Sequence, residues 1–197
     1  MINKYSYINL YENKKKNSKL SSQILYGEKF TILKKYKDWY RIKTSYDKYE
    51  GYIKKKKFEE FNFKPTHKVS SLKANIFLKP DRNSQIKMKL SFSSLLHVKS
   101  SKKGFLNFDD YWIQKSDVVP LNYREKIFKR ISIFRNVKYK WGGKKFDGVD
   151  CSGLIQLFYK FNNLYCPRDT GPQFKYFKRF KSIKKDAIIF WKGHVAV

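Results

Sequence analysis

An imperfect internal repeat in the first 120 residues constrains the fold more than any other feature of this sequence. Three segments recur: Asn17-Ser18-Lys19-Leu20 as Asn83-Ser84-Gln85-Ile86, Trp39-Tyr40-Arg41-Ile42 as Phe105-Leu106-Asn107-Phe108, and Gly51-Tyr52-Ile53-Lys54 as Tyr111-Trp112-Ile113-Gln114. The second copy lacks most of the segment Ser45–Glu50. Two copies of a unit of roughly 60 residues, near the lower size limit of an independent domain, predict two small β-barrels. One split sandwich made from both copies is the alternative.

The boundaries of these units follow from turn residues and prolines. Short runs that favour strands, such as Phe30–Leu33, Trp39–Lys43 and Gly51–Ile53, are separated by turn residues and lysines. The segment Asn62–Thr66 is the predicted joint between the copies, and Pro120-Leu121-Asn122 marks the next boundary because proline cannot continue a central strand. We therefore expect domains at residues 1–60, 61–120 and 121–197.

The third unit mixes helix and strand. Ile127, Phe128, Ile131 and Phe134 have helical spacing and predict a helix over 124–134. A second helix is expected to begin near Asp150 and to end before Pro167. Its apolar stripe comprises Leu154, Ile155, Leu157, Phe158 and Phe161. The final residues, from Asp186 onward, predict a β-hairpin with its turn at Lys192-Gly193. The predicted fold class is therefore α+β.

Cys151 is the candidate nucleophile. Asp150 can cap the helix that starts there, and the helix dipole then stabilises a thiolate on Cys151. A lone cysteine at a helix start is more often a small buried residue, but the glycine-rich surroundings favour a nucleophile. Cys166 precedes Pro167 without a cap or a helix start, and we interpret it as a packing residue. A disulfide between the two cysteines is the alternative, which a reducing compartment disfavours.

A thiolate nucleophile needs a base within hydrogen-bonding reach. His194 follows a glycine and opens the last predicted strand, where an imidazole can face a helix N-terminus. An ordinary strand histidine is the alternative, which the motif around Cys151 makes less attractive. His67 and His97 are interpreted as ordinary surface or strand residues.

Composition limits the partners of the chain. The formal net charge is +29, but the lysines are spread along the whole sequence. We interpret them as solvated faces and expect weak attraction to polyanions but no specific nucleic acid; binding of nucleic acid driven by charge is the alternative. The sequence contains no run near the roughly 18 apolar residues of a membrane span and no secretory signal at its start. Two cysteines are also too few for a disulfide framework, which fits a reducing compartment, so we expect a cytoplasmic protein. We further expect a monomer.

The third unit resembles the NlpC/P60 family of cell-wall peptidases. The matching residues, in order, are Tyr139-x-Trp141-Gly142-Gly143, Asp150-Cys151-Ser152-Gly153-Leu154, Pro167-Arg168-Asp169-Thr170 with Gln173, and Asp186 before Ile189-Phe190 and His194-Val195. The first unit resembles the bacterial SH3 domains that precede such peptidases. Its matching residues are Ser22–Glu28, Trp39, and Asp47-x-Tyr49-x-Gly51-Tyr52.

The resemblance implies a papain-like thiol protease, with helices packed on an antiparallel sheet, that needs neither a metal nor another cofactor. It would hydrolyse the γ-D-glutamyl bond to a diamino acid in murein (peptidoglycan) peptides, with Cys151 as nucleophile and His194 as base and then acid. Tyr139 would help to position the oxyanion. In the subgroup with SH3 domains and no export signal, which trims free L-alanine-starting peptides during cell-wall recycling, the free amine would contact Asp150, Ser152 and Tyr49.

The sequence departs from the family pattern in one respect. The family places a third polar residue, usually histidine, on the strand after the one that carries the catalytic histidine, and this sequence stops at Val197. We therefore expect a truncated peptidase domain, and the alternative function is a catalytically impaired protein that binds wall fragments or peptides through its SH3 domains. Tyr49 has separate support because it lies in the segment that the second repeat lacks.

Overall fold

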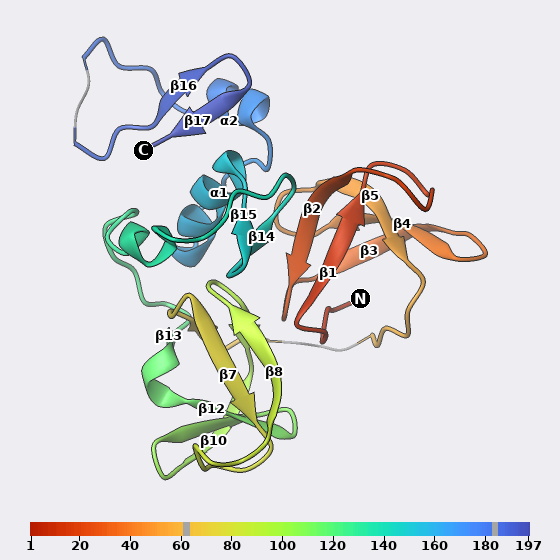
Figure 1. Cartoon of the computed structure of the whole chain (residues 1–197), viewed down its shortest axis with the longest axis vertical. Helices are drawn as coiled ribbons and strands as arrows, with labels where there is room; N and C mark the ends of the chain where they lie inside the picture. The colour runs from red at the N-terminus through yellow and green to blue at the C-terminus, as the bar shows by residue number, and fades with distance from the viewer. Residues whose placement is uncertain (61–63, 183–184) are drawn as a thin grey trace.

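The structure is a computed structural model that describes residues 1–60, 64–182 and 185–197. It has the predicted α+β class: two β-rich parts are followed by a part that contains both described α-helices (Figure 1). Of the predicted joint between the repeats, Asn62 and Phe63 lie outside the described residues. Neither α-helix has the length and the apolar sequence that crossing a lipid bilayer requires.

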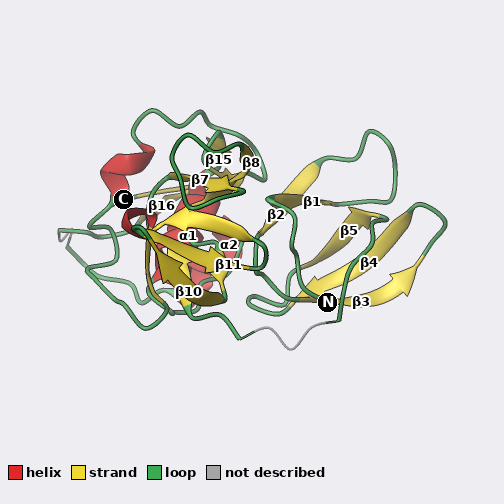
Figure 2. Cartoon of the chain, turned by 90° about the horizontal axis from the view of Figure 1, so that it is seen from below, coloured by secondary structure: helices red, strands yellow, loops and turns green. Residues whose placement is uncertain are grey.

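The two repeats form two five-stranded sheets with the same strand order. The first sheet has the order β2 (Leu20–Leu25), β1 (Tyr7–Tyr11), β5 (Glu50–Lys54), β4 (Trp39–Thr44), β3 (Phe30–Lys35). The second has the order β8 (Ile86–Ser91), β7 (Lys73–Phe77), β12 (Tyr111–Gln114), β11 (Phe105–Phe108), β10 (Val98–Lys102). This correspondence confirms the repeat and its three predicted strands. Figure 2 shows β1–β5 to one side of the remaining elements.

Each sheet has its own apolar core, so the copies do not share one split sandwich. Residues along β1 alternate between partly exposed and buried positions, as expected for a strand with one face on a core. Leu10, Ile42 and Ile53 are fully buried in the core of the first sheet, and Ile76 and Ile113 are fully buried in that of the second.

The segments around the second sheet form a small sheet of their own. It has the order β13 (Val118–Pro120), β6 (His67–Val69), β9 (Leu95–Leu96), and a short 3-10 helix, η1 (Lys115–Asp117), leads into β13. Because β6 precedes the second five-stranded sheet in sequence and β13 follows it, the two ends of this part are joined by hydrogen bonds before the chain enters the third part.

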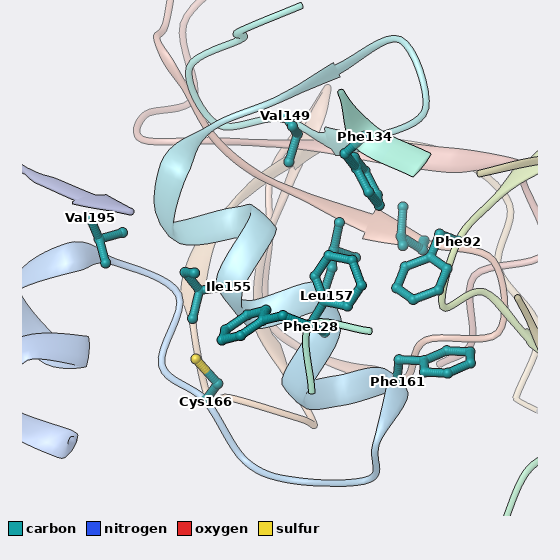
Figure 3. Packing of buried hydrophobic residues seen from close by; sticks show 11 residues of the cluster. Phe92, Phe128, Phe134, Val149, Ile155, Leu157, Phe161, Cys166 and Val195 are labelled. Atoms are coloured by element: carbon teal, nitrogen blue, oxygen red, sulfur yellow. The ribbon is translucent and has the colours of Figure 1, made fainter. Parts of the chain in front are cut away.

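The third part is arranged around α1 (Cys151–Phe161). The other elements are η2 (Ile131–Phe134), β14 (Lys144–Lys145), β15 (Gly148–Val149), α2 (Thr170–Tyr176), β16 (Ile189–Trp191) and β17 (His194–Ala196). The start of α1 and the final hairpin are where the sequence predicts them. Figure 3 shows the core around α1, where Ile155 faces Val195 of β17 and Phe161 lies near Phe92 from the second part. The rings of Phe92 and Phe161 stack with centroids 4.6 Å apart.

The predicted helix over 124–134 is wrong. The segment forms turns and the short 3-10 helix η2, with bonds between residues three apart, such as Ile131 N to Phe128 O at 3.0 Å. The apolar spacing reflects packing, since the buried rings of Phe128 and Phe134 lie 5.8 and 5.7 Å from the ring of Phe158 on α1. Conversely, α2 is a helix that was not predicted. Its first turn contains Pro172, at a position where proline costs no intrahelical bond.

Buried ion pairs and hydrogen bonds join the three parts. Glu28, from the first part, contacts the ammonium groups of Lys144 and Lys160 in the third. Burial alone would raise the pKa of Glu28, but the two lysines outweigh it and leave this pKa below its ordinary value. Lys160 also donates to the carbonyl of Ser93 in the second part. The side chain of Lys68 donates to the carbonyl of Phe161 at the end of α1, where helix carbonyls lack intrahelical partners.

Candidate functional site

The side chain of Asp150 caps helix α1 and so fixes the position of Cys151. The Gly153 amide donates to Asp150 Oδ1 at 2.7 Å, and Asp150 has the extended backbone of an N-cap residue. Cys151 is therefore the first residue of the helix, and its side chain is partly exposed. Unpaired amides and the positive end of the helix dipole favour negative charge at this place, which suits a thiolate and an oxyanion beside it.

A buried guanidinium holds the capping carboxylate from the other side. Arg168 donates from Nη1 to Asp150 Oδ1 at 2.9 Å and from Nη2 to Oδ2 at 2.7 Å, and the amide of Gly142 donates to Oδ2 at 2.8 Å. Arg168 Nη1 also donates to the hydroxyl of Ser152 at 3.1 Å. The predicted substrate-binding residues Asp150 and Ser152 are thus brought together, but both are buried and already hydrogen-bonded to Arg168.

Arg168 also ties the site to the first sheet. Its Nε donates to the hydroxyl of Ser22 on β2 at 2.9 Å, and the amide of Lys144 donates to Gln23 Oε1, also on β2, at 2.7 Å. Burial alone would lower the pKa of Arg168, but the carboxylate of Asp150 outweighs it and leaves this pKa raised. The frame of the site therefore includes residues from both ends of the chain.

Tyr139 and His194 lie on the open side of the site. Burial, followed by the charges of Cys151 and Asp150, raises the pKa of Tyr139. The His194 ring lies 6.5 Å from the ring of Tyr139 and 4.8 Å from that of Trp191, between centroids. Across the ranges 1–60, 64–182 and 185–197 the structure shows no direct hydrogen bond between Cys151 and His194. Catalytic hydrogen bonds are often long before a substrate binds.

Tyr49 reaches the same region from the first part. Its hydroxyl donates to Asp169 Oδ1 at 3.5 Å, across 120 positions of sequence. Burial and the neighbouring carboxylate of Asp169 raise the pKa of Tyr49 to about 12. Thr170, the next residue after Asp169, places its hydroxyl oxygen 3.8 Å from Cys151 Sγ. Asp169 is therefore the neighbour in sequence of a residue that contacts the nucleophile, and Tyr49 and Asp169 are both partly exposed.

Arg168, Asp169 and Thr170 belong to the sequence motif, but the motif alone predicts no role for them. A local signal was present, because Asp169 precedes a Thr-Gly-Pro-Gln run typical of a helix start, and the structure places it at the N-cap of α2. The partners of these residues, Ser22 and Tyr49, lie far away in sequence and could not be read from the motif.

The remaining cysteine packs behind this constellation, and the other two histidines belong to the second part. Cys166 is fully buried among apolar residues, as predicted, and its carbonyl accepts from Gln156 at 3.1 Å. His67 contacts the Thr66 hydroxyl at 3.0 Å, and His97 contacts the carbonyl of Lys64 at 2.6 Å. Among the described residues, no group of three or more His, Cys, Asp or Glu side chains is arranged to hold a metal ion.

The two cysteines should differ sharply in reactivity. Both are free thiols, but burial raises the pKa of Cys166 to about 12, while Cys151 is partly exposed at a helix N-terminus. We expect iodoacetamide at neutral pH to modify the native chain once, at Cys151, as identified by peptide mass spectrometry. Cys151→Ser should leave the native chain unmodified, and denaturant should then expose one thiol. Rapid modification of Cys166 in the native chain would contradict this picture.

Comparison with protein-family models gives two matches. Residues 136–197 match the NlpC/P60 family, and residues 10–58 match the bacterial dipeptidyl-peptidase SH3 domain. The first match covers Tyr139, Cys151 and His194, and the second covers Ser22 and Tyr49.

Two curated proteins are similar to the chain. The γ-D-glutamyl-L-lysine dipeptidyl-peptidase of Bacillus subtilis is 27% identical over 79% of this chain and 58% of its own length. The dipeptidyl-peptidase 6 of Lysinibacillus sphaericus is 25% identical over 96% of this chain and 80% of its own length. The chain thus spans little more than half of the Bacillus subtilis protein.

A solved structure has the same fold. The crystal structure of an NlpC/P60 family protein from Bacillus cereus superposes on 99% of this chain and 85% of its own, with a TM-score of 0.79 and 18% identity. The arrangement of the three parts therefore occurs in a protein of experimentally determined structure.

Proposed function

Since residues 136–197 belong to the NlpC/P60 family and residues 10–58 form a bacterial dipeptidyl-peptidase SH3 domain, we propose that this protein is a cysteine peptidase acting on murein peptides. The bond that we propose it hydrolyses is the amide bond between the γ-carboxyl group of D-glutamate and the following diamino acid. The observation that carries the proposal is the position of Cys151 at the N-terminus of α1, together with His194, whose ring lies 6.5 Å from that of Tyr139 between centroids. The name of the similar Bacillus subtilis protein, γ-D-glutamyl-L-lysine dipeptidyl-peptidase, fits this bond.

In the proposed mechanism, Cys151 attacks the γ-carbonyl carbon of D-glutamate and His194 accepts the thiol proton. A sulfur–carbon bond forms, and the oxyanion is stabilised by the Tyr139 hydroxyl and the amides of the first turn of α1. The carbon–nitrogen bond then breaks as His194 returns the proton to the amine of the diamino acid. Water, deprotonated by His194, hydrolyses the thioester and frees Cys151.

Recognition of the free amine is proposed to fall to Asp169 and Tyr49. The carboxylate of Asp169 is partly exposed next to Thr170, and the hydroxyl of Tyr49 approaches it from the first part. An ammonium group held there would limit the substrate to a peptide with two residues before the cleaved bond. Asp150 and Ser152 act in this proposal through Arg168, because their polar groups are already engaged with it.

The test is hydrolysis of L-Ala-γ-D-Glu-L-Lys by the protein that contains this chain, with release of L-Ala-D-Glu followed by mass spectrometry. Acetylating the alanine amine should lower kcat/KM at least tenfold, since a charge-assisted hydrogen bond contributes on the order of 1.5–3 kcal/mol. Asp169→Asn should lower kcat/KM for the free peptide. The ratio of kcat/KM for the free peptide to that for the acetylated peptide should therefore become smaller. If the unsubstituted protein hydrolysed both peptides at equal rates, amine recognition would be refuted, while the assignment of Cys151 as the nucleophile would be unaffected.

The setting of the reaction belongs to the same proposal. Free peptides that start with L-alanine suit a role in cell-wall recycling, and two free cysteines suit a reducing, cytoplasmic compartment. We also propose the division into residues 1–60 and 61–120 as SH3-like domains and 121–197 as the peptidase domain, acting as a monomer.

A further inference from the structure

Aromatic and cationic side chains share the outer face of the first sheet. Tyr11 pairs directly with Tyr52, Tyr52 with Arg41, and Arg41 with Lys34. Directly paired residues of neighbouring strands point to the same face, so these four form one row across β1, β5, β4 and β3. Leu10, next to Tyr11 in sequence, points to the opposite face and is fully buried in the core.

A second row extends this face. Trp39 and Lys54 pair with each other, two residues away from Arg41 and Tyr52, and so point the same way. The Trp39 ring lies 5.5 Å from that of Tyr11, and the Tyr36 ring lies 6.1 Å from that of Tyr52, between centroids. All four rings are partly exposed. We call this surface the aromatic–cationic face; it comprises Tyr11, Lys34, Tyr36, Trp39, Arg41, Tyr52 and Lys54.

The second sheet is an internal control for this face. Its equivalent row is Phe77, Trp112, Asn107 and Ser100, and its second row is Phe105 with Gln114 and Lys102. The three cations Lys34, Arg41 and Lys54 therefore correspond to the neutral residues Ser100, Asn107 and Gln114.

The rings of the two copies also differ in exposure. Phe77 and Phe105 are 2% and 5% exposed and pack on each other with centroids 5.6 Å apart, whereas Tyr11 and Trp39 remain partly exposed. The same strand order thus forms without cations at the positions of Lys34, Arg41 and Lys54, and with Trp112, at the position of Tyr52, as the one partly exposed ring among Phe77, Phe105 and Trp112. Because the fold does not require them, the features of the first copy point to a ligand.

The chemistry of this face matches an unpaired polynucleotide. Cationic side chains bind phosphates, while exposed aromatic rings stack on bases, whose faces are accessible only outside a duplex. We propose that the aromatic–cationic face binds single-stranded nucleic acid without sequence preference. The carboxylate of Glu50 holds Arg41 and Lys43 at 2.8 Å each, and a phosphate would take its place on Arg41. This gives the lysine-rich composition one defined contact surface, separate from the peptidase site.

The test measures the affinity of the full chain for a fluorescently labelled oligothymidine by anisotropy at several salt concentrations. The variant Lys34→Ser/Arg41→Asn/Lys54→Gln introduces the residues of the second copy. The control Lys87→Ser/Lys89→Ser/Lys99→Ser removes the same charge from the second sheet, where these lysines are exposed. The first variant should bind at least about tenfold more weakly. Its plot of log binding constant against log salt concentration should also be less steep by about 2, as expected for the loss of three phosphate contacts on a single strand. The control should bind nearly as the unsubstituted chain.

The rings are tested separately from the charge. Trp39→Ala should weaken binding by about tenfold, and Trp39→Phe should restore most of the affinity, because stacking needs a ring. Inorganic polyphosphate, at an equal concentration of phosphate groups, should displace the oligothymidine poorly. Equal losses in the two triple variants, or absent binding at low salt, would overturn the proposal. Full competition by polyphosphate with an unchanged Trp39→Ala would instead identify a surface for anionic polymers without bases. Thermal melts followed by circular dichroism verify that each variant folds.

Discussion

Replacing Cys151 by alanine is expected to abolish hydrolysis of L-Ala-γ-D-Glu-L-Lys while the fold persists. Without the thiol no acyl-enzyme can form, and loss of a nucleophile typically lowers kcat by at least about ten-thousand-fold. The unfolding free energy should change by less than about 0.5 kcal/mol, because Cys151 is partly exposed at the first position of α1, where alanine is well tolerated. Product formation is measured by mass spectrometry, and stability by denaturant unfolding.

The second cysteine supplies the matched control. Cys166→Ala removes a buried thiol that packs behind the site, so it should cost stability but preserve turnover. If Cys151→Ala retained turnover, Cys151 would not be the nucleophile. If Cys166→Ala lost turnover while still folded, the assignment of the two thiols would be reversed.

Arg168→Ala is expected to give the largest loss of stability. It leaves the carboxylate of Asp150 buried without its ion pair, and breaking a buried pair in this way costs about 3–5 kcal/mol. The hydroxyls of Ser22 and Ser152 lose a donor as well. Because Asp150 caps α1, the variant should also disturb the position of Cys151 and slow its alkylation by iodoacetamide. Denaturant unfolding gives the first quantity, and the alkylation rate under native conditions gives the second.

Another arginine of the chain forms an ion pair of nearly the same length in an exposed place. Arg41 Nη2 lies 2.8 Å from Glu50 Oε2, and the two side chains are 48% and 34% exposed, against 1% and 8% for Arg168 and Asp150. Arg41→Ala should therefore cost less than about 1 kcal/mol and leave alkylation unchanged. Similar losses for the two variants would mean that the Arg168–Asp150 pair does not stabilise the site.

The sequence predicted the elements whose signals are local or repeated. The recurrence of the Trp39 and Gly51 segments predicted two equivalent sheets, and the structure has the same strand order in both. The Asp150-Cys151 pair predicted a capped helix start because a cap is read within three residues. The spacing of Phe128 and Phe134 gave a wrong prediction of a helix, because two rings can reach one core from turns as well as from an α-helix.

The motif indicates the residues of the candidate site but not their connections. One motif predicts Cys151, Tyr139 and His194, whereas the partners of Arg168 and Asp169 lie 146 and 120 positions away, at Ser22 and Tyr49. No local pattern reports such pairs, because they depend on how the parts pack together. The saturated carboxylate of Asp150 was missed for the same reason: sequence shows that a carboxylate is present, not how many donors already surround it.

The buried contacts of Glu28 with Lys144 and Lys160 have an evolutionary consequence. An SH3 domain on a flexible tether can be exchanged, lost or duplicated without changing its neighbour. Here replacing Glu28 leaves the buried ammonium groups of Lys144 and Lys160 without their carboxylate, so this position can change only together with its partners. The N-terminal part therefore cannot be exchanged for another without a matching change in the third part.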